Sequence, residues 1–257
     1  MTLREQLNAF FTLLTREIRR FSRIWIQTIL PAMITTALYF VIFGNLIGSQ
    51  IGDMKGYRYI DYIIPGLILM SVITNSYANV VSSFYSSKFQ RNIEEMLVSP
   101  MPSYVILLGF IAGGVARGLS CGLAVTIVAL FFSHLEISNL AVVLSIAFLT
   151  AVLFSLGGFI NAIFAKSFDD ISIVPTFVLT PLTYLGGIFY TIAVLPEFWR
   201  TVSLGNPILY MVNAFRYGVL GTSDIDVTTS YFIILLFIIA MFSFSLYLLE
   251  KGHGIRN

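Results

Sequence analysis

Residues that could perform catalysis or bind a metal ion are few in this sequence and lie far apart. The two histidines are His134 and His253, and the single cysteine, Cys121, sits in an apolar run. A His/Cys metal site needs several such ligands close together, and neither an H-E-x-x-H nor a G-x-S-x-G pattern occurs. None of the four lysines follows the glycine that a nucleotide-binding P-loop requires. We therefore predict that the chain is not an enzyme, has no catalytic residue and binds no metal or cofactor itself.

Charged side chains that could bind a partner gather in residues 88–102, between two long apolar runs. We read this stretch as a short helix that starts at a capping box of Ser87 and Gln90 and ends at Pro100. An apolar stripe then lies on one face, and the helix is too short to span a membrane. It could lie on lipid headgroups or dock a partner protein. The candidate docking residues are Lys88, Phe89, Arg91, Asn92, Ile93, Glu94, Glu95, Met96 and Leu97.

Polar side chains also interrupt two of the long apolar runs. In the second run they recur every three or four residues and form one stripe, made of Ser71, Asn75, Asn79, Ser82 and Ser86. Such a stripe bonds a neighbouring helix or contacts a substrate. Arg117 lies about 14 residues into the third run, where a charge needs a partner or water. It either bonds backbone carbonyls across a helix interface or lines a path and meets an anionic headgroup. The candidate path residues are therefore Ser71, Asn75, Asn79 and Arg117.

The surrounding sequence is typical of an integral membrane protein. Hydrophobic residues make up 57% of the 257 residues, charged residues make up 11%, and the mean hydropathy is +0.88. A soluble domain has about 25% charged residues. The net charge of +2 excludes a large basic face for nucleic acid. An amphipathic helix over residues 1–23, starting at a capping box of Thr2 and Glu5, should lie on anionic headgroups. Six apolar runs of spanning length follow, at 24–47, 59–82, 103–132, 140–165, 171–190 and 231–249.

The distribution of basic residues predicts which side faces the cytoplasm. Six spans place both termini on one side, together with residues 88–102. That side holds ten basic residues, Arg256 among them, and the opposite side holds four. Because cytoplasmic loops carry the excess of Lys and Arg, both termini and the 88–102 helix should be cytoplasmic.

Residues 181–221 do not resemble a simple outer loop, because they are apolar but broken by glycines and prolines. Asn206 and Pro207 predict the start of a helix that runs to Leu220, and Gly221 is placed to end it. At about 21 Å this helix is shorter than the roughly 30 Å hydrocarbon core. We expect a re-entrant helical hairpin in the outer leaflet, packed against other spans or a subunit partner. Its candidate residues are Gly187, Phe189, Pro196, Asn206, Pro207, Tyr210, Asn213 and Arg216. The last three share a face that could cap a pathway or stabilise the helix.

Two motifs connect this arrangement to a known family. The first comprises Glu94, Leu97, Ser99–Pro100 and Gly109. The second, more specific, motif comprises Pro181, Gly187–Ile188–Phe189, Leu195–Pro196, Asn206–Pro207, Tyr210, Arg216 and Gly221. Over essentially its whole length the chain resembles the permease subunits of type-2 ATP-binding-cassette exporters, most closely the YadH-type bacterial inner-membrane permeases. It departs from the family pattern at Thr191, where proline is common, and at Asn213, where an acidic residue is frequent. These departures leave open the local hairpin geometry and any charge pair with Arg216.

The resemblance implies an all-α half-transporter in a bacterial cytoplasmic membrane, acting as a homodimer. A separate ATPase subunit would bind ATP and Mg and dock on the coupling helix at 88–100. The substrate would be amphiphilic or lipid-linked, such as a drug, lipid or glycan, and would move outward. We expect one transmembrane domain over 1–257. It consists of an interfacial helix (1–23), four spans (24–165), a fifth span with the hairpin (171–221) and a sixth span (231–249).

Two other classes of protein remain as alternatives. A secondary transporter or channel without an ATPase usually shows inverted repeats and ionisable groups near the midplane of the membrane. No repeat is visible, and Arg117 is the only charge near a midplane. A membrane-embedded enzyme or assembly factor is the other alternative, and it lacks a catalytic constellation.

Overall fold

The amino-terminal part of the chain is a series of helices separated by breaks. The computed structural model describes residues 1–252 and 254, so His253 and Arg256 lie outside the described residues. α1 (Leu3–Arg23) begins at the predicted capping box, in which Glu5 N–H donates to the Thr2 hydroxyl and Thr2 N–H to the Glu5 carboxylate. The predicted first span, 24–47, is helical but divided into α2 (Trp25–Thr28), α3 (Leu30–Tyr39) and the π-helix η1 (Phe40–Ile47), and α4 (Gly48–Ile51) follows it.

Long helices form the rest of the bundle, and they match the predicted apolar runs. They are α5 (Tyr59–Phe89), α7 (Ser103–Ala129), α8 (Leu140–Phe164) and α13 (Val227–Lys251). The short helix α6 (Asn92–Val98) joins α5 to α7. Before α5, the strands β1 (Asp53–Met54) and β2 (Tyr57–Arg58) pair antiparallel, with Asp53 opposite Arg58. Lys55 and Gly56 both have positive φ and make the tight turn between these strands.

Short helices occupy most of residues 170–220. They are α9 (Asp170–Val174), the π-helix η2 (Pro175–Leu179), α10 (Thr180–Tyr184), the 3₁₀-helix η3 (Ile192–Val194), α11 (Glu197–Leu204) and α12 (Pro207–Leu220). α12 has the predicted ends: the Asn206 side chain accepts from Ile208 N–H, Pro207 is in the first turn, and Gly221 adopts the left-handed conformation with φ of 73°.

Within the described residues, five helical stretches are long and apolar enough to span a membrane. They correspond to the predicted first, second, third, fourth and last spans. The predicted fifth span, 171–190, is not among them, because its helical part covers only residues 170–184. That length is about 22 Å, short of the roughly 30 Å hydrocarbon core. The count of six spans therefore stays a prediction.

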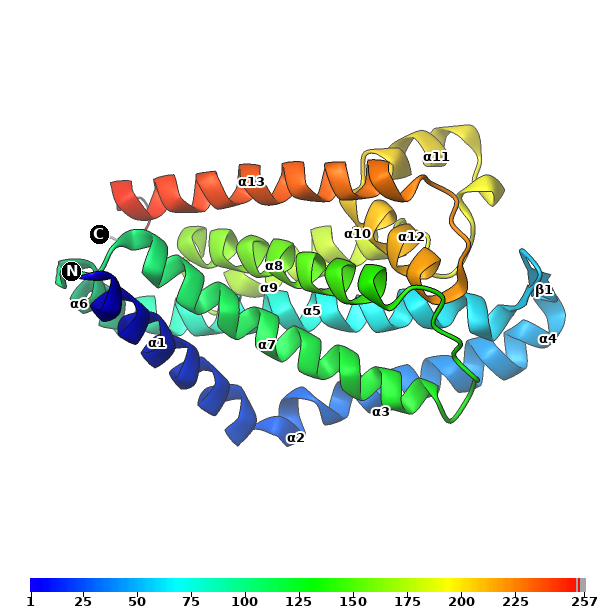
Figure 1. Cartoon of the computed structure of the whole chain (residues 1–257), viewed down its shortest axis with the longest axis horizontal. Helices are drawn as coiled ribbons and strands as arrows, with labels where there is room; N and C mark the ends of the chain where they lie inside the picture. Colours follow the sequence, from blue (N-terminus) through cyan, green and yellow to red (C-terminus); the bar gives the residue numbers. More distant parts are fainter. Residues whose placement is uncertain (253, 255–257) are drawn as a thin grey trace.

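α5 is the centre of the bundle, and 83% of its most apolar stretch is buried, against 22% for α13. It packs against α7 and α8, and α1 packs on α7 (Figure 1). Glycines permit these close contacts: a Cβ on Gly113 of α7 would lie 2.5 Å from Glu17 Cβ of α1, and one on Gly158 of α8 would lie 2.5 Å from the Tyr77 carbonyl of α5. The start of α1, α6 and the end of α13 lie at one end of the bundle, and β1, α11 and α12 lie toward the other (Figure 1).

Candidate functional site

The predicted docking helix exists, but it starts later than predicted. α5 continues through Lys88 to Phe89, and α6 begins only at Asn92. Arg91 makes the turn between them with a positive φ of 60°. Ser87 does not cap a helix, because its hydroxyl donates to the Ser83 carbonyl of the previous turn of α5. The predicted capping-box start was therefore wrong. Core packing extends α5 past Ser87, and the Ser87 hydroxyl makes its hydrogen bond within that helix. The predicted end of the helix at Pro100 was closer to the structure, since α6 ends at Val98.

The predicted docking residues divide into an anchored set and an exposed set. Ile93 is completely buried, and Met96 and Leu97 are partly buried against the core of the chain itself. The predicted apolar stripe is therefore not free for a partner along these three residues. The side chains open to a partner are Phe89, Arg91, Asn92, Glu94, Glu95 and Val98, of which Val98 is 86% exposed. α6 is thus fixed to the bundle by one face and presents a mainly polar face outward.

Lys88 has a structural contact that the sequence did not indicate. Its ammonium group donates to the backbone carbonyls of Ile163 (2.6 Å) and Ala165 (2.8 Å), at the carboxyl end of α8. A cation at this end satisfies carbonyls that lack helical partners. Phe89 lies beside it and packs edge-on against Phe168, with ring centroids 5.3 Å apart. Lys88 therefore ties the end of α5 to α8 and does not point toward a partner.

The polar stripe of α5 faces α1 and α7. Ser71 and Asn79 are buried, and the others are partly buried. Arg20 of α1 donates to the Asn79 side-chain carbonyl (2.8 Å), to the Asn79 backbone carbonyl (2.9 Å) and to the Ser82 hydroxyl (3.4 Å). Interhelical hydrogen bonding, one of the two predicted roles, is therefore present at Asn79 and Ser82.

Arg117 of α7 reaches the same stripe farther along α5. Its guanidinium donates to the Asn75 side-chain carbonyl at 3.4 Å. The expected bonds to backbone carbonyls are not made in the described part of the chain, because the Asn75 amide stands opposite and offers an acceptor. Arg117 and Asn75 line a cavity of about 290 Å³ together with Ser71, Thr74 and residues of α2 and α3. Three of the four predicted path residues therefore meet at one cavity, and Asn79 lies one helical turn beyond it.

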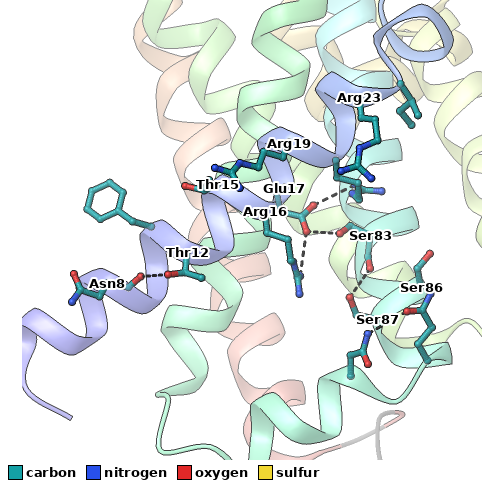
Figure 2. A pocket seen from close by; sticks show the side chains of 15 residues that line it. Asn8, Thr12, Thr15, Arg16, Glu17, Arg19, Arg23, Ser83, Ser86 and Ser87 are labelled. Carbon is teal, nitrogen blue, oxygen red and sulfur yellow. Dashed lines mark hydrogen bonds and ion pairs between the residues drawn. The ribbon is translucent and has the colours of Figure 1, made fainter.

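A buried carboxylate lies beside the end of this stripe that is nearer to α6. Glu17 of α1 is 1% exposed; its Oε1 accepts from the Ser83 hydroxyl (2.7 Å) and from Arg16 (3.2 Å), and Oε2 lies 3.3 Å from Arg20. Figure 2 shows Arg16 and Glu17 pointing from α1 toward Ser83 of α5. Burying a carboxylate is costly unless it has such partners. Glu17 therefore contacts two arginines of α1: Arg20, which reaches α5, and Arg16, whose guanidinium lies over the Phe110 ring of α7.

At the other end of the bundle, Arg216 of α12 is fully inside the protein. It is 1% exposed and donates to the backbone carbonyls of Gly187 (2.6 Å) and Tyr62 (3.3 Å). Its guanidinium lies over the Tyr62 ring at 4.0 Å from the centroid. Because no described carboxylate forms an ion pair with Arg216, the arginine serves to join α12, α5 and the turn at Gly187. This supports the helix-stabilising interpretation of its face over a cap on a pathway.

The remaining hairpin residues make local contacts that hold the short helices together. Asn213 accepts from Asp224 N–H at 3.0 Å, and the Tyr210 hydroxyl donates to the Leu204 carbonyl at 2.7 Å. The Asn206 amide donates to the Leu182 carbonyl at 2.6 Å, so one asparagine caps α12 and holds α10. Phe189 stacks on Tyr184, Gly187 turns the chain with φ of 72°, and Pro196 precedes α11. The eight predicted residues thus share one region, although its depth in a membrane stays a prediction.

The sequence matches the ABC-2 type transporter family over residues 8–220, from α1 to the end of α12. This match covers most of the chain. The protein belongs to the ABC-2 type transporter family. It is therefore a membrane component of an ATP-binding-cassette transporter, and membership of the family implies an ABC ATPase as partner.

The relatives of this ABC-2 permease agree with that assignment. The chain is 56% identical over 242 residues, 94% of each protein, to "Inner membrane transport permease YadH" of Escherichia coli (strain K12). It is 24% identical over 215 residues to "Nodulation protein J" of Rhizobium leguminosarum bv. trifolii, covering 83% of this chain and 82% of that protein. The same-named protein of Rhizobium meliloti (strain 1021) is 23% identical over 206 residues, 80% of this chain and 79% of that protein.

Sequence reasoning about this ABC-2 permease missed Glu17. It treated α1 as an amphipathic helix with arginines on its polar surface, and it gave no role to the one acid near its end. The signal was present, because Leu13, Glu17 and Phe21 are spaced by four residues and are the buried residues of α1. An acidic residue on the buried face of a basic helix indicates a bonded partner on the neighbouring element.

Proposed function

We propose that this protein is the membrane-spanning half of an ATP-driven exporter. Two copies form a homodimer with six spans each, both termini in the cytoplasm, and residues 181–221 as a re-entrant hairpin in the outer leaflet. A separate ATPase holds ATP and Mg and docks on α6. The transported substrate is amphiphilic or lipid-linked, such as a drug, lipid or glycan, and moves outward.

The observation that carries this proposal is the two-sided character of α6. Ile93 is completely buried, whereas Glu94 and Glu95 on the opposite side are exposed at the end of the bundle that holds both described ends of the chain. A partner that moves the exposed face must move the anchored face with it. Because only Gln90 and Arg91 separate α6 from α5, that displacement passes to the central helix. This is the arrangement needed to couple an external motor to a two-state bundle.

Charge reversal on α6 tests the docking role. We expect Glu94→Lys with Glu95→Lys to weaken co-purification with the ATPase roughly tenfold or more, because like charges replace complementary ones at the contact. The matched control is Glu136→Lys with Glu197→Lys, two exposed acids, one between α7 and α8 and one in the first turn of α11. Ile93→Asp would be unsuitable, since it places a charge in the core. A fully coupled complex from the α6 variant, equal to that of the control, contradicts α6 docking.

The cavity at Arg117 supports a path along the polar face of α5. Arg117, Asn75 and Ser71 place a cation, an amide and a hydroxyl around a space that further hydroxyl groups and the apolar side chains of Leu67 and Met70 also line. Such a lining can hold the polar part of an amphiphile while its apolar part stays in lipid or among the spans.

Replacement of the cavity residues tests this path. We expect Arg117→Leu and Asn75→Leu to abolish export of amphiphilic dyes or lipid analogues from vesicles while the ATPase complex still assembles. Arg117→Lys keeps the charge and should retain part of the activity. An assembled Arg117→Leu complex with normal export would show that Arg117 only packs helices.

A further inference from the structure

A second, larger cavity lies beside the Glu17 contacts, between α1 and the last turns of α5. Its volume is about 1050 Å³, and it is open along one side of the bundle. Figure 2 shows side chains from both helices lining it, with Thr12, Thr15 and Arg19 on α1 and Ser86 and Ser87 on α5. The cavity lining is therefore polar, although the helices around it belong to an apolar bundle.

The charge of this cavity is strongly positive. Arg16, Arg19, Arg20 and Arg23 line it, and Glu17 is its only acidic lining residue. The Glu17 carboxylate is already in contact with Arg16 and Arg20. Among the described residues, no acid pairs with Arg19 or Arg23, and both side chains are exposed at the rim. Four guanidinium groups around one carboxylate leave an unmatched site for an anion, and arginine binds phosphate oxygens in a bidentate way.

The position of the cavity along α5 matches the depth of lipid headgroups. α5 has 31 residues and is about 46 Å long, so about 8 Å at each end extends beyond a roughly 30 Å hydrocarbon core. The α5 residues that line the cavity are Ser83, Ser86 and Ser87, in the last two turns of the helix, and Gln90 follows its last residue. Phe11 and Ile24, both exposed apolar side chains, also line it. Phosphate donors and apolar surface therefore lie side by side where a lipid has both groups.

We propose that this cavity binds the phosphate headgroup of an anionic membrane lipid. Arg19 and Arg23 contact the phosphate, Ser86, Ser87 and Gln90 supply further polar contacts, and Phe11 and Ile24 contact the upper part of the acyl chains. Glu17 contacts Arg16 and Arg20, so this part of the positive lining is already ordered before the lipid binds, and only the exposed Arg19 and Arg23 become ordered on binding. The lipid is a resident ligand of α1, and its binding does not depend on which substrate is transported.

Trp25, the second residue after α1, provides a reporter for this site. In a Trp199→Phe background it is the only tryptophan of the full-length chain. We would reconstitute that protein in vesicles of phosphatidylcholine with a minor fraction of phosphatidylglycerol, and brominate the acyl chains of one lipid at a time. Quenching of Trp25 by each brominated lipid then gives the local enrichment of phosphatidylglycerol over phosphatidylcholine.

The matched comparison is between two double variants that lose the same charge from the same end of the bundle. Arg19→Gln with Arg23→Gln alters the cavity, and Arg4→Gln with Lys251→Gln alters exposed basic residues outside it. We expect enrichment in the parent protein, a fall of roughly fivefold for each arginine removed from the cavity, and little change in the control pair. Equal losses in both pairs would show general attraction to a basic surface and overturn the site. Loss of enrichment on adding excess inorganic phosphate at constant ionic strength would overturn the lipid as ligand in favour of a free anion.

Discussion

Arg216 offers the sharpest test of the architecture, because one side chain joins three separate elements. Its guanidinium donates to the Gly187 carbonyl at 2.6 Å and to the Tyr62 carbonyl at 3.3 Å, and it lies 4.0 Å from the centre of the Tyr62 ring. Replacing it with leucine keeps the apolar stem but removes every donor. The Gly187 carbonyl would then lose its Arg216 donor inside the protein, and the Tyr62 carbonyl would keep only its helical partner in α5.

The size of the effect follows from these contacts. Each buried carbonyl that loses its donor costs about 1–3 kcal/mol, and a desolvated cation–π contact contributes about 2 kcal/mol. Removing a buried charge also recovers part of the free energy spent on its desolvation. We therefore expect Arg216→Leu to lower the free energy of unfolding by about 3 kcal/mol. For a chain of this size that corresponds to a fall in Tm of about 6–12 °C.

The assay is thermal unfolding of the purified full-length protein in detergent, followed by fluorescence and by loss of monodispersity. Arg200→Leu, on an exposed position of α11, is the matched control and should leave Tm nearly unchanged. Tyr62→Phe keeps the ring and removes a hydroxyl that has no hydrogen-bond partner in the described chain, so it should also be tolerated. The reasoning is refuted if Arg216→Leu is as stable as the Arg200 variant, or if Tyr62→Phe is equally damaging.

Three further perturbations test other parts of the structure. A Cβ on Gly113 would lie 2.5 Å from a side-chain carbon of α1, so Gly113→Ala should lower the free energy of unfolding by about 1–3 kcal/mol, which a fall in Tm would report. The control Gly157→Ala, with no contact under 3.7 Å, should leave Tm unchanged. Lys88→Met should lower Tm, because it leaves carbonyls at the end of α8 without a donor. It should not impair co-purification with the ATPase. Loss of the complex from a variant that is still stable would show that Lys88 is a docking residue after all. Backbone N–H donors, that of Lys166 first, hold the pKa of Asp170 below its usual range, so its stabilisation is complete above about pH 4, the unfolded pKa, and is lost as pH falls through the lower folded pKa. Asp170→Asn should therefore flatten Tm against pH below about pH 5, and an unchanged slope would contradict this.

Local signals in the sequence were sufficient wherever a helix end depends on its own residues. Thr2 with Glu5, and Asn206–Pro207 with Gly221, predicted the ends of α1 and α12, since each cap is satisfied within one turn. The long apolar runs likewise predicted α5, α7, α8 and α13. The candidate site was predicted in the same way where it rests on periodicity: the α5 stripe has one face, and that face meets α1 and the Arg117 cavity.

Features that depend on tertiary contacts were not predictable from the same signals. The capping box at Ser87 has the right spacing, but core packing of α5 extends that helix past it. The sequence around Lys88 does not distinguish it from a surface lysine, because its hydrogen-bond acceptors lie at the end of α8. Glu17 was treated as part of a charged helix surface, although it is buried and accepts a hydrogen bond from Ser83, a residue 66 positions away. In each case the partner that decides the conformation lies on another helix, so a single-helix pattern could not identify it.

The contacts of α5 differ in how easily they can change, and this bears on coupling. On the side of α7 and α8, glycines at Gly114, Gly122 and Gly158 leave no space for a side chain, so α5 is packed against backbone and moves with these helices. On the side of α1, the contacts are hydrogen bonds from Arg20 to Asn79 and Ser82 and from Ser83 to Glu17, and the helix is interrupted directly after α1, at Ile24. Polar contacts can exchange with water or a ligand at small net cost, whereas close packing cannot. A displacement that enters α5 through α6 should therefore separate α5 from α1 first, at the stripe between the two cavities.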